Sequence, residues 1–199
     1  MSRQTTAFLG ACISAAVLLV TAAFPSAQTT GTSGTSRERY VATAVNMGQP
    51  GPTGPWTVEM VVSRWSTEGE RDRLVSVLRM KGPEALLDAL RDMPRAGYIR
   101  TPDSLAYDLH FARKQPLEDG GERVFLATDR YIGFWEATRR PRTIDYPFTY
   151  MELRIGPDGK GEGKMSIFTK IAYDKEENGI VLENYGTQPV LLQNVRKDD

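Results

Sequence analysis

The sequence is poor in the residues that build metal sites and covalent cross-links. Among its 199 residues it has one histidine, His110, and one cysteine, Cys12. Zinc, copper and haem sites depend on His and Cys ligands, so the chain offers no motif for them. A disulfide needs two cysteines, so a folded domain must be held together by its core. We therefore expect no metal and no cofactor.

The chain also lacks an excess of charge of either sign. It carries 25 Lys and Arg residues against 25 Asp and Glu residues. Proteins that bind nucleic acids or acidic membrane surfaces usually show a clear positive excess. The composition therefore predicts a partner other than a nucleic acid, and it leaves the oligomeric state open.

The one long apolar segment lies at the N-terminus. Arg3 is followed by an apolar stretch over residues 5–23 and then by the small residues of "FPSAQ". A basic start, an apolar centre and a small-residue cleavage site are the three parts of a secretory signal peptide. We predict a signal peptide over residues 1–27, cleaved after Ala27 or after Ala23. The mature protein would then be exported, periplasmic or secreted, without a transmembrane segment.

Two alternatives to cleavage at this site stay open. The apolar stretch can be extended to a length that spans a bilayer, which would make it an uncleaved membrane anchor. The segment "LGAC", residues 9–12, resembles a bacterial lipobox, which would make the protein a lipoprotein lipidated at Cys12. A lipobox cysteine ends the apolar segment, however, whereas the strongest apolar residues here follow Cys12. We therefore favour an ordinary signal-core residue at this position.

The next part of the chain, residues 28–55, predicts a flexible leader. It contains the Thr/Ser/Gly-rich "QTTGTSGTSRER" and the Pro/Gly-rich "NMGQPGPTGP", compositions that are typical of irregular chain. The short "RYVATAV" between them can add an edge strand or stay irregular. Residues 56–199 are long enough to form a single domain with its own core.

Within residues 56–199 the apolar pattern changes twice. "WTVEMVVSRW" alternates as a first strand does. Thr67 and Glu70 then have the spacing of a capping box, and Gly82 followed by Pro83 is typical of one helix ending and another beginning. From Tyr98 onward, alternating segments separated by turn sequences predict seven more strands.

This order predicts an α+β fold. We expect a strongly curved antiparallel sheet or partial β-barrel of about eight strands, with a helix pair inserted after the first strand. The order of elements resembles the start of a helix-grip (START-like) domain, in which a curved sheet holds an apolar ligand against a long C-terminal helix. The chain departs from that pattern at its end, "VLLQNVRKDD", which is too short and too β-branched for such a helix.

Four segments carry a second resemblance. "GYIRTPDSLAYDL", "TDRYIGFWE", "RTIDYPFT" and "GKGEGK" resemble a group of exported bacterial proteins of unassigned function. Together they span most of the domain. The resemblance implies an exported bacterial protein, and it carries over no activity and no site.

The main candidate binding segment is "TDRYIGFWEATRRPRTIDYPF", residues 128–148. Its aromatic residues can stack on a planar ligand or form an apolar rim, and its arginines can hold a carboxylate or phosphate. The candidate ligand-binding residues are Tyr131, Trp135, Arg130, Arg139, Arg140 and Arg142, with Arg100 from an earlier strand. Nearby acidic residues almost balance these arginines, so we interpret the segment as a self-paired covering loop in which Tyr131 and Trp135 make any ligand contact.

Catalytic candidates are few. His110 could act as a base with Ser104 and either Asp103 or Asp108, but the chain has no Gly-x-Ser-x-Gly elbow around a nucleophile. A histidine on the polar face of a strand is more often a hydrogen-bonded surface residue.

Carboxylate pairs are the other source of acid–base chemistry, since two facing carboxyl groups can share the work without a histidine. Glu136 and Asp145 flank the arginines of residues 128–148, and the simpler interpretation is that they pair with those arginines.

Three classes of function follow. The first, which we favour, is an exported non-enzymatic domain that binds a small apolar or amphipathic ligand in the curved sheet or at its mouth. The second is an envelope structural or interaction protein with a filled core that binds a protein or glycan. The third is a metal-independent hydrolase or isomerase that uses carboxylates or His110. An apolar cavity favours the first, a solid core with an exposed apolar patch the second, and titratable groups that converge in a cleft the third.

Overall fold

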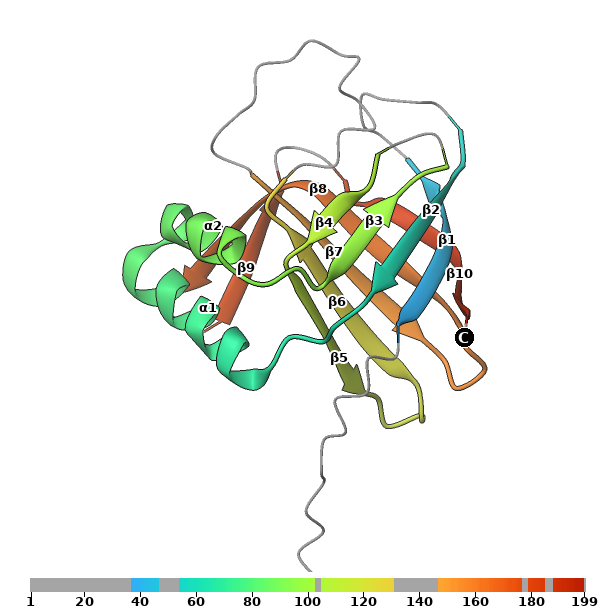
Figure 1. Cartoon of the computed structure of the whole chain (residues 1–199), viewed down its shortest axis with the longest axis horizontal. Helices are drawn as coiled ribbons and strands as arrows, with labels where there is room; N and C mark the ends of the chain where they lie inside the picture. Colours follow the sequence, from blue (N-terminus) through green and yellow to red (C-terminus); the bar gives the residue numbers. More distant parts are fainter. Residues whose placement is uncertain are drawn as a thin grey trace, which may run out of the picture. The chain divides into compact units, whose positions relative to one another are not determined.

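The computed structural model describes residues 37–46, 54–102, 105–130, 147–176, 179–184 and 188–198, which all lie in one compact unit. It is an α+β structure, as the sequence predicts (Figure 1). The elements are β1 (Glu38–Val45), β2 (Trp56–Val62), α1 (Glu68–Lys81), α2 (Pro83–Arg91), β3 (Gly97–Arg100), β4 (Tyr107–Leu109), β5 (Phe111–Pro116), β6 (Glu122–Thr128), β7 (Phe148–Ile155), β8 (Lys160–Asp174), β9 (Gly179–Asn184) and β10 (Val190–Asp198).

All ten described strands belong to one antiparallel sheet. Its order is β4-β3-β2-β1-β10-β8-β7-β6-β5, and β9 pairs with β8 beside this path. The expectation of a strongly curved sheet or partial barrel is wrong, because the sheet is neither closed nor strongly curled. Alternation of apolar residues shows which side chains face the core, but it does not determine how far neighbouring strands coil or whether the first and last strands meet.

The strand count also differs from the expected eight, partly because two strands precede the helices. The extra one is β1, which lies within the predicted leader. It pairs with β2 on one side and with β10 on the other, so it is an inner strand, whereas the sequence left an edge strand or irregular chain open. Tyr40, Ala42 and Ala44 alternate along it and are almost fully buried. The period-2 pattern of "RYVATAV" was the available signal.

One face of the sheet forms the main core. This cluster draws on every described strand except β9, and each of its members is at most 5 % exposed. Its residues are Tyr40, Ala42, Ala44, Val58, Met60, Val62, Ala96, Ile99, Leu109, Ala112, Val124, Leu126, Met151, Leu153, Ile155, Met165, Ile167, Val190, Leu192 and Val195. The core that the sheet builds for itself is therefore closed to solvent.

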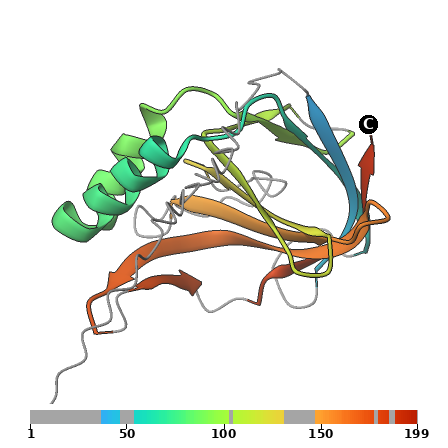
Figure 2. The same ribbon diagram turned by 90° about the horizontal axis from the view of Figure 1, so that it is seen from below.

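The helix pair covers part of the opposite face. On β6, Leu126 belongs to the main core and Ala127 to a second cluster with the helices, since successive side chains of a strand point to opposite faces. This second cluster contains Leu74, Leu78, Leu86, Ala89, Leu90, Met93, Ala127 and Phe148. Figure 2 shows the two helices lying across from the outer parts of β8 and β9.

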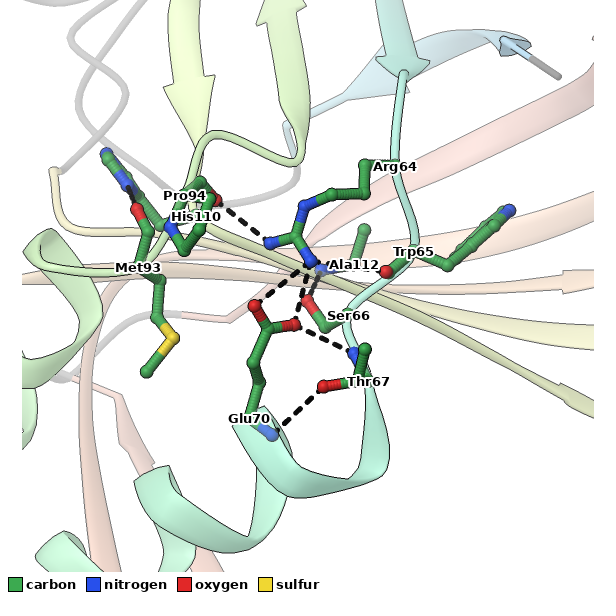
Figure 3. Close-up of polar contacts among 9 residues, drawn as sticks. All are labelled: Arg64, Trp65, Ser66, Thr67, Glu70, Met93, Pro94, His110 and Ala112. Atoms are coloured by element: carbon green, nitrogen blue, oxygen red, sulfur yellow. Dashed lines mark hydrogen bonds and ion pairs between the residues drawn. The ribbon is translucent and has the colours of Figure 1, made fainter. Parts of the chain in front are cut away.

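The start of α1 confirms the predicted capping box. The Thr67 hydroxyl accepts a hydrogen bond from the Glu70 amide at 3.2 Å, and the Glu70 carboxylate accepts one from the Thr67 amide at 2.8 Å (Figure 3). Arg64 adds a second tie: its guanidinium donates to both Glu70 oxygens and, at 3.2 Å, to the Pro94 carbonyl beyond α2. The same three residues thus orient the first helix and anchor the chain that leaves the second.

We expect Thr67→Ala to lower the free energy of unfolding by about 1 kcal/mol, because the Glu70 amide loses its acceptor. Urea unfolding measures the change. Ser76→Ala is the control, since it removes an exposed hydroxyl from the middle of the same helix and should be neutral or slightly stabilising. Equal losses in both variants would contradict a capping role for Thr67.

Candidate functional site

Most of the predicted binding segment lies outside the described residues, so its role stays a prediction. This applies to Tyr131, Trp135, Glu136, Arg139, Arg140, Arg142 and Asp145, and also to Asp103 and Ser104. Two members of the predicted set are described. Arg130 is exposed just after β6, and Arg100 lies on β3.

Arg100 belongs to a group of side chains on β1, β2 and β3. Its guanidinium lies 3.0 Å from the Glu59 carboxylate and 5.7 Å from the centre of the Tyr98 ring. Arg39 binds the other oxygen of Glu59 at 2.8 Å. Burial raises the pKa of Glu59, but the hydrogen bonds from Arg100, Arg39 and Tyr98 outweigh it and lower that pKa. The described contacts of Arg100 are thus those of a paired side chain.

His110 lies at the junction of β4 and β5 and is largely buried. Its Nδ1 is 3.2 Å from the Met93 carbonyl oxygen, which can only accept, so Nδ1 carries a proton in this contact (Figure 3). Its Nε2 lies 3.5 Å from Asp129, and the other oxygen of Asp129 accepts from Arg91 at 3.1 Å. These contacts tie the strand junction to the end of α2.

Of the two carboxylates considered as partners of His110, Asp103 lies outside the described residues and Asp108 has a different role. Asp108 forms an ion pair with Arg95 at 2.7 Å, and both side chains are about half exposed. His110 therefore has Asp129, and not Asp108, as its described carboxylate partner. Asp129 directly follows β6, and no spacing rule links it to His110, so this contact could not be predicted from the sequence.

The site that the sequence did not single out is a cavity of about 290 Å³ between the helix pair and the sheet. Its lining comes from both helices and from β5, β6, β7, β8 and β9. The lining residues are Arg71, Leu74, Val75, Leu78, Leu86, Leu90, Phe111, Arg113, Gln115, Phe125, Ala127, Tyr150, Ile171, Ile180 and Leu182. None of them belongs to the main core of the sheet. The cavity is thus a second, separate interior.

The lining is strongly apolar. Of the fifteen described residues that form it, eleven are aliphatic or phenylalanine, and the others are Arg71, Arg113, Gln115 and Tyr150. Small-molecule pockets share this character, with mainly apolar walls and a few polar groups, and their volumes begin at about 300 Å³. A void without partner atoms forfeits dispersion contacts with its walls, so an apolar occupant would recover them.

Tyr150 is the aromatic polar group of this lining. Burial, and then the negative charge of Glu152, raise the pKa of its hydroxyl above the usual value. The hydroxyl is therefore a protonated donor at neutral pH. Its ring stacks near Phe125, with centroids 6.4 Å apart. Both rings form part of the cavity wall.

A second feature missed by the sequence is a charged cluster, formed by Glu38, Tyr40, Lys114, Glu122 and Lys197. Lys114 Nζ lies 2.6 Å from Glu38 and 3.9 Å from Glu122. Lys197 Nζ lies 2.9 Å from Glu38 and 3.0 Å from Glu122. The Tyr40 hydroxyl donates to Glu38 at 2.8 Å. Two lysines and two glutamates thus neutralise one another.

The pKa values of the charged cluster follow from burial and hydrogen bonding. Burial raises the pKa of Glu38, but hydrogen bonds from Lys114, Lys197 and Tyr40 outweigh it and lower that pKa to about 2. Burial and the bond to Glu38 raise the pKa of the Tyr40 hydroxyl. Lys114, Glu122 and Lys197 also line a polar cavity of about 560 Å³. Because the charges are already paired, we interpret the cluster as structural.

In the described part of the chain, no group of three or more His, Cys, Asp or Glu side chains could hold a metal ion. Nor is either described helix long and apolar enough to cross a membrane. The chain matches no protein-family model, no curated protein and no solved structure.

Proposed function

We propose that the protein is a non-enzymatic domain that holds a small apolar or amphipathic ligand between its helix pair and its sheet. The observation that supports this proposal is the cavity of about 290 Å³ with its mainly apolar lining. The place differs from the one expected from the sequence, which was the interior or mouth of a curved sheet. The sheet is not strongly curled, and the residues of its main core are at most 5 % exposed.

The cavity has a route to solvent along β9. Ile180 and Leu182 line it and are nevertheless 52 % and 36 % exposed. β9 is paired with β8 and lies beside the main strand path. A ligand can therefore enter at this margin without disturbing the core of the sheet, which lies on the other face.

The alternative of an interaction protein is supported by the same strand. Val181 alternates with Ile180 and Leu182 and is 39 % exposed, so β9 shows apolar side chains on both of its faces. An envelope protein that uses this strand against a protein or glycan would have no need of a saturable small-ligand site. Binding of a small apolar probe therefore separates the two functions.

We expect the purified protein to bind the neutral fluorescent probe N-phenylnaphthylamine saturably, and Val75→Trp to weaken this binding about tenfold or more. Val75 lines the cavity from α1, so the larger side chain fills the space. Fluorescence titration gives both affinities.

The matched control is Met80→Trp, on the same helix at a position that is 72 % exposed. This variant should bind the probe as the unmodified protein does. Circular dichroism and urea unfolding establish that both variants are folded. No saturable binding to the unmodified protein, or equal binding by both variants, would overturn the proposed function.

A further inference from the structure

The polar residues of the cavity are not scattered around it. Phe111, Arg113 and Gln115 alternate along β5 and all line the cavity, so this strand face changes from apolar to polar along its length. Successive members of this set are about 7 Å apart. The cavity thus has an apolar part beside Phe111 and a polar part beside Arg113.

The face of helix α1 that lines the cavity also changes from polar to apolar along its length. Arg71 and Leu78 both line the cavity and are separated by about two helical turns, or roughly 10 Å. Arg113 on β5 lies 2.8 Å from Glu68 in the first turn of α1. Residues 68 and 71 lie on the same helix face, so Arg71 is placed at the same end as Arg113. Both arginines therefore mark one end of the cavity.

The charged residues that line the cavity itself are of one sign only. Among the described lining residues, Arg71 and Arg113 are charged, and none is an aspartate or a glutamate. The rest of the lining includes leucines from both helices and isoleucines from β8 and β9. This distribution complements a ligand with an apolar tail and an anionic head, and it disfavours a cationic head.

The present partners of the two arginines are easily replaced. Arg113 pairs with Glu68, which is 70 % exposed, and Arg71 pairs with Asp72, which is 67 % exposed. Ion pairs with exposed partners contribute little to stability. The Arg113 side chain itself is only 20 % exposed, so a ligand head that binds it is partly shielded from water. Planar guanidinium groups bind carboxylates through two parallel hydrogen bonds.

We propose that the ligand is a single-tailed alkyl carboxylate of the fatty-acid type, with its tail among the leucines and its carboxylate on Arg113 and Arg71. This inference depends on the proposed function. The volume of about 290 Å³ lies at the lower limit of small-molecule pockets, which suits one alkyl chain of short or medium length.

The test is displacement of bound N-phenylnaphthylamine by decanoate, decanol, decylamine and decyl sulfate at pH 8. Decanoate should compete about tenfold better than decanol, because it adds a charge-assisted pair to the same tail, and decylamine should compete less well than decanol. Arg113→Gln should remove the advantage of decanoate over decanol, with each competition measured relative to that variant's own affinity for the probe.

Arg123→Gln is the matched control, since Arg123 lies on β6, pairs with Glu152 at 3.3 Å and is not part of the lining. It should keep the preference for decanoate. Equal competition by decanoate and decanol would overturn this inference while the probe site, and with it the proposed function, stands. Equal competition by decyl sulfate would overturn the assignment of a carboxylate. No probe binding at all would instead show that the proposed function has failed.

Discussion

Glu38→Gln is expected to lower the free energy of unfolding at pH 7 by about 3 kcal/mol. The carboxylate is only 11 % exposed and lies within hydrogen-bonding distance of Lys114, Lys197 and Tyr40. Glutamine keeps the shape but removes the charge, so two ammonium groups are left to share Glu122. A shift of the Glu38 pKa from 4.5 to about 2 corresponds to about 3 kcal/mol of preference for the ionised form in the folded state.

The same pKa determines how the contribution of the Glu38 carboxylate to stability depends on pH. The folded-state pKa is lower than the unfolded one, so the folded protein holds its proton less tightly than the unfolded chain. The contribution is therefore complete above about pH 4.5 and is lost as the pH falls toward 2. The difference in stability between the unmodified protein and Glu38→Gln should shrink over the same interval.

Urea unfolding at pH 7, 5 and about 3 measures both effects. Glu152→Gln is the control, because Glu152 pairs with Arg123 on the surface and both side chains are more than 40 % exposed. Glu152→Gln should lower the free energy of unfolding by less than about 1 kcal/mol at every pH. A loss for Glu38→Gln no larger than that of the control, or one that grows as the pH falls, would be incompatible with the charged cluster described here.

The sequence predicted those parts of the fold that are encoded by neighbouring residues. Thr67 and Glu70 are three positions apart, and their capping box is present as expected. Gly82 ends α1 with a positive φ of 88°, and Pro83 begins α2. These features depend on short-range sterics and hydrogen bonds, so a single sequence is enough to place them.

The charged cluster shows why other parts could not be predicted. Glu38 is 76 residues from Lys114, and Glu122 is 75 residues from Lys197, so these contacts depend on the order of the strands. Glu38 also follows a Thr/Ser/Gly-rich stretch, which favoured the interpretation of a leader. Glu38 lies on an inner strand because β1 pairs with β10, and these two strands are the first and the last of the described strands in the sequence.

The cavity could not be predicted from the sequence for a different reason. Leu74, Leu78, Leu86 and Leu90 recur at helical spacing in the sequence, and they face the sheet in the structure. A stripe determines which side of a helix is buried, but not whether the space beneath it is completely filled. That depends on side-chain volumes on strands such as β6, where Ala127 lies under the helices. Packing volume is a property of the assembled layers.

Gly161→Ala is expected to lower the free energy of unfolding by about 3 kcal/mol or more, as large an effect as that of Glu38→Gln. Gly161 lies on β8 and is paired with Ile155 of β7 and Val195 of β10. A Cβ at this position would overlap the Arg154 carbonyl oxygen and lie 2.8 Å from its carbonyl carbon. Both neighbours are backbone atoms of an inner ladder, so they cannot move aside as the end of a flexible side chain can.

Gly69→Ala makes the same chemical change at a position where we expect the free energy of unfolding to rise. Gly69 lies in the first turn of α1, and nothing is within 4 Å of a Cβ there. Alanine should raise the stability by up to about 1 kcal/mol, because it restricts the unfolded chain and favours the helix. Thermal and urea unfolding of the two variants compare them directly. If Gly161→Ala were as stable as the unmodified protein, β7 and β8 could not approach each other as closely as the ladder requires, and the register through Ile155 and Gly161 would be wrong.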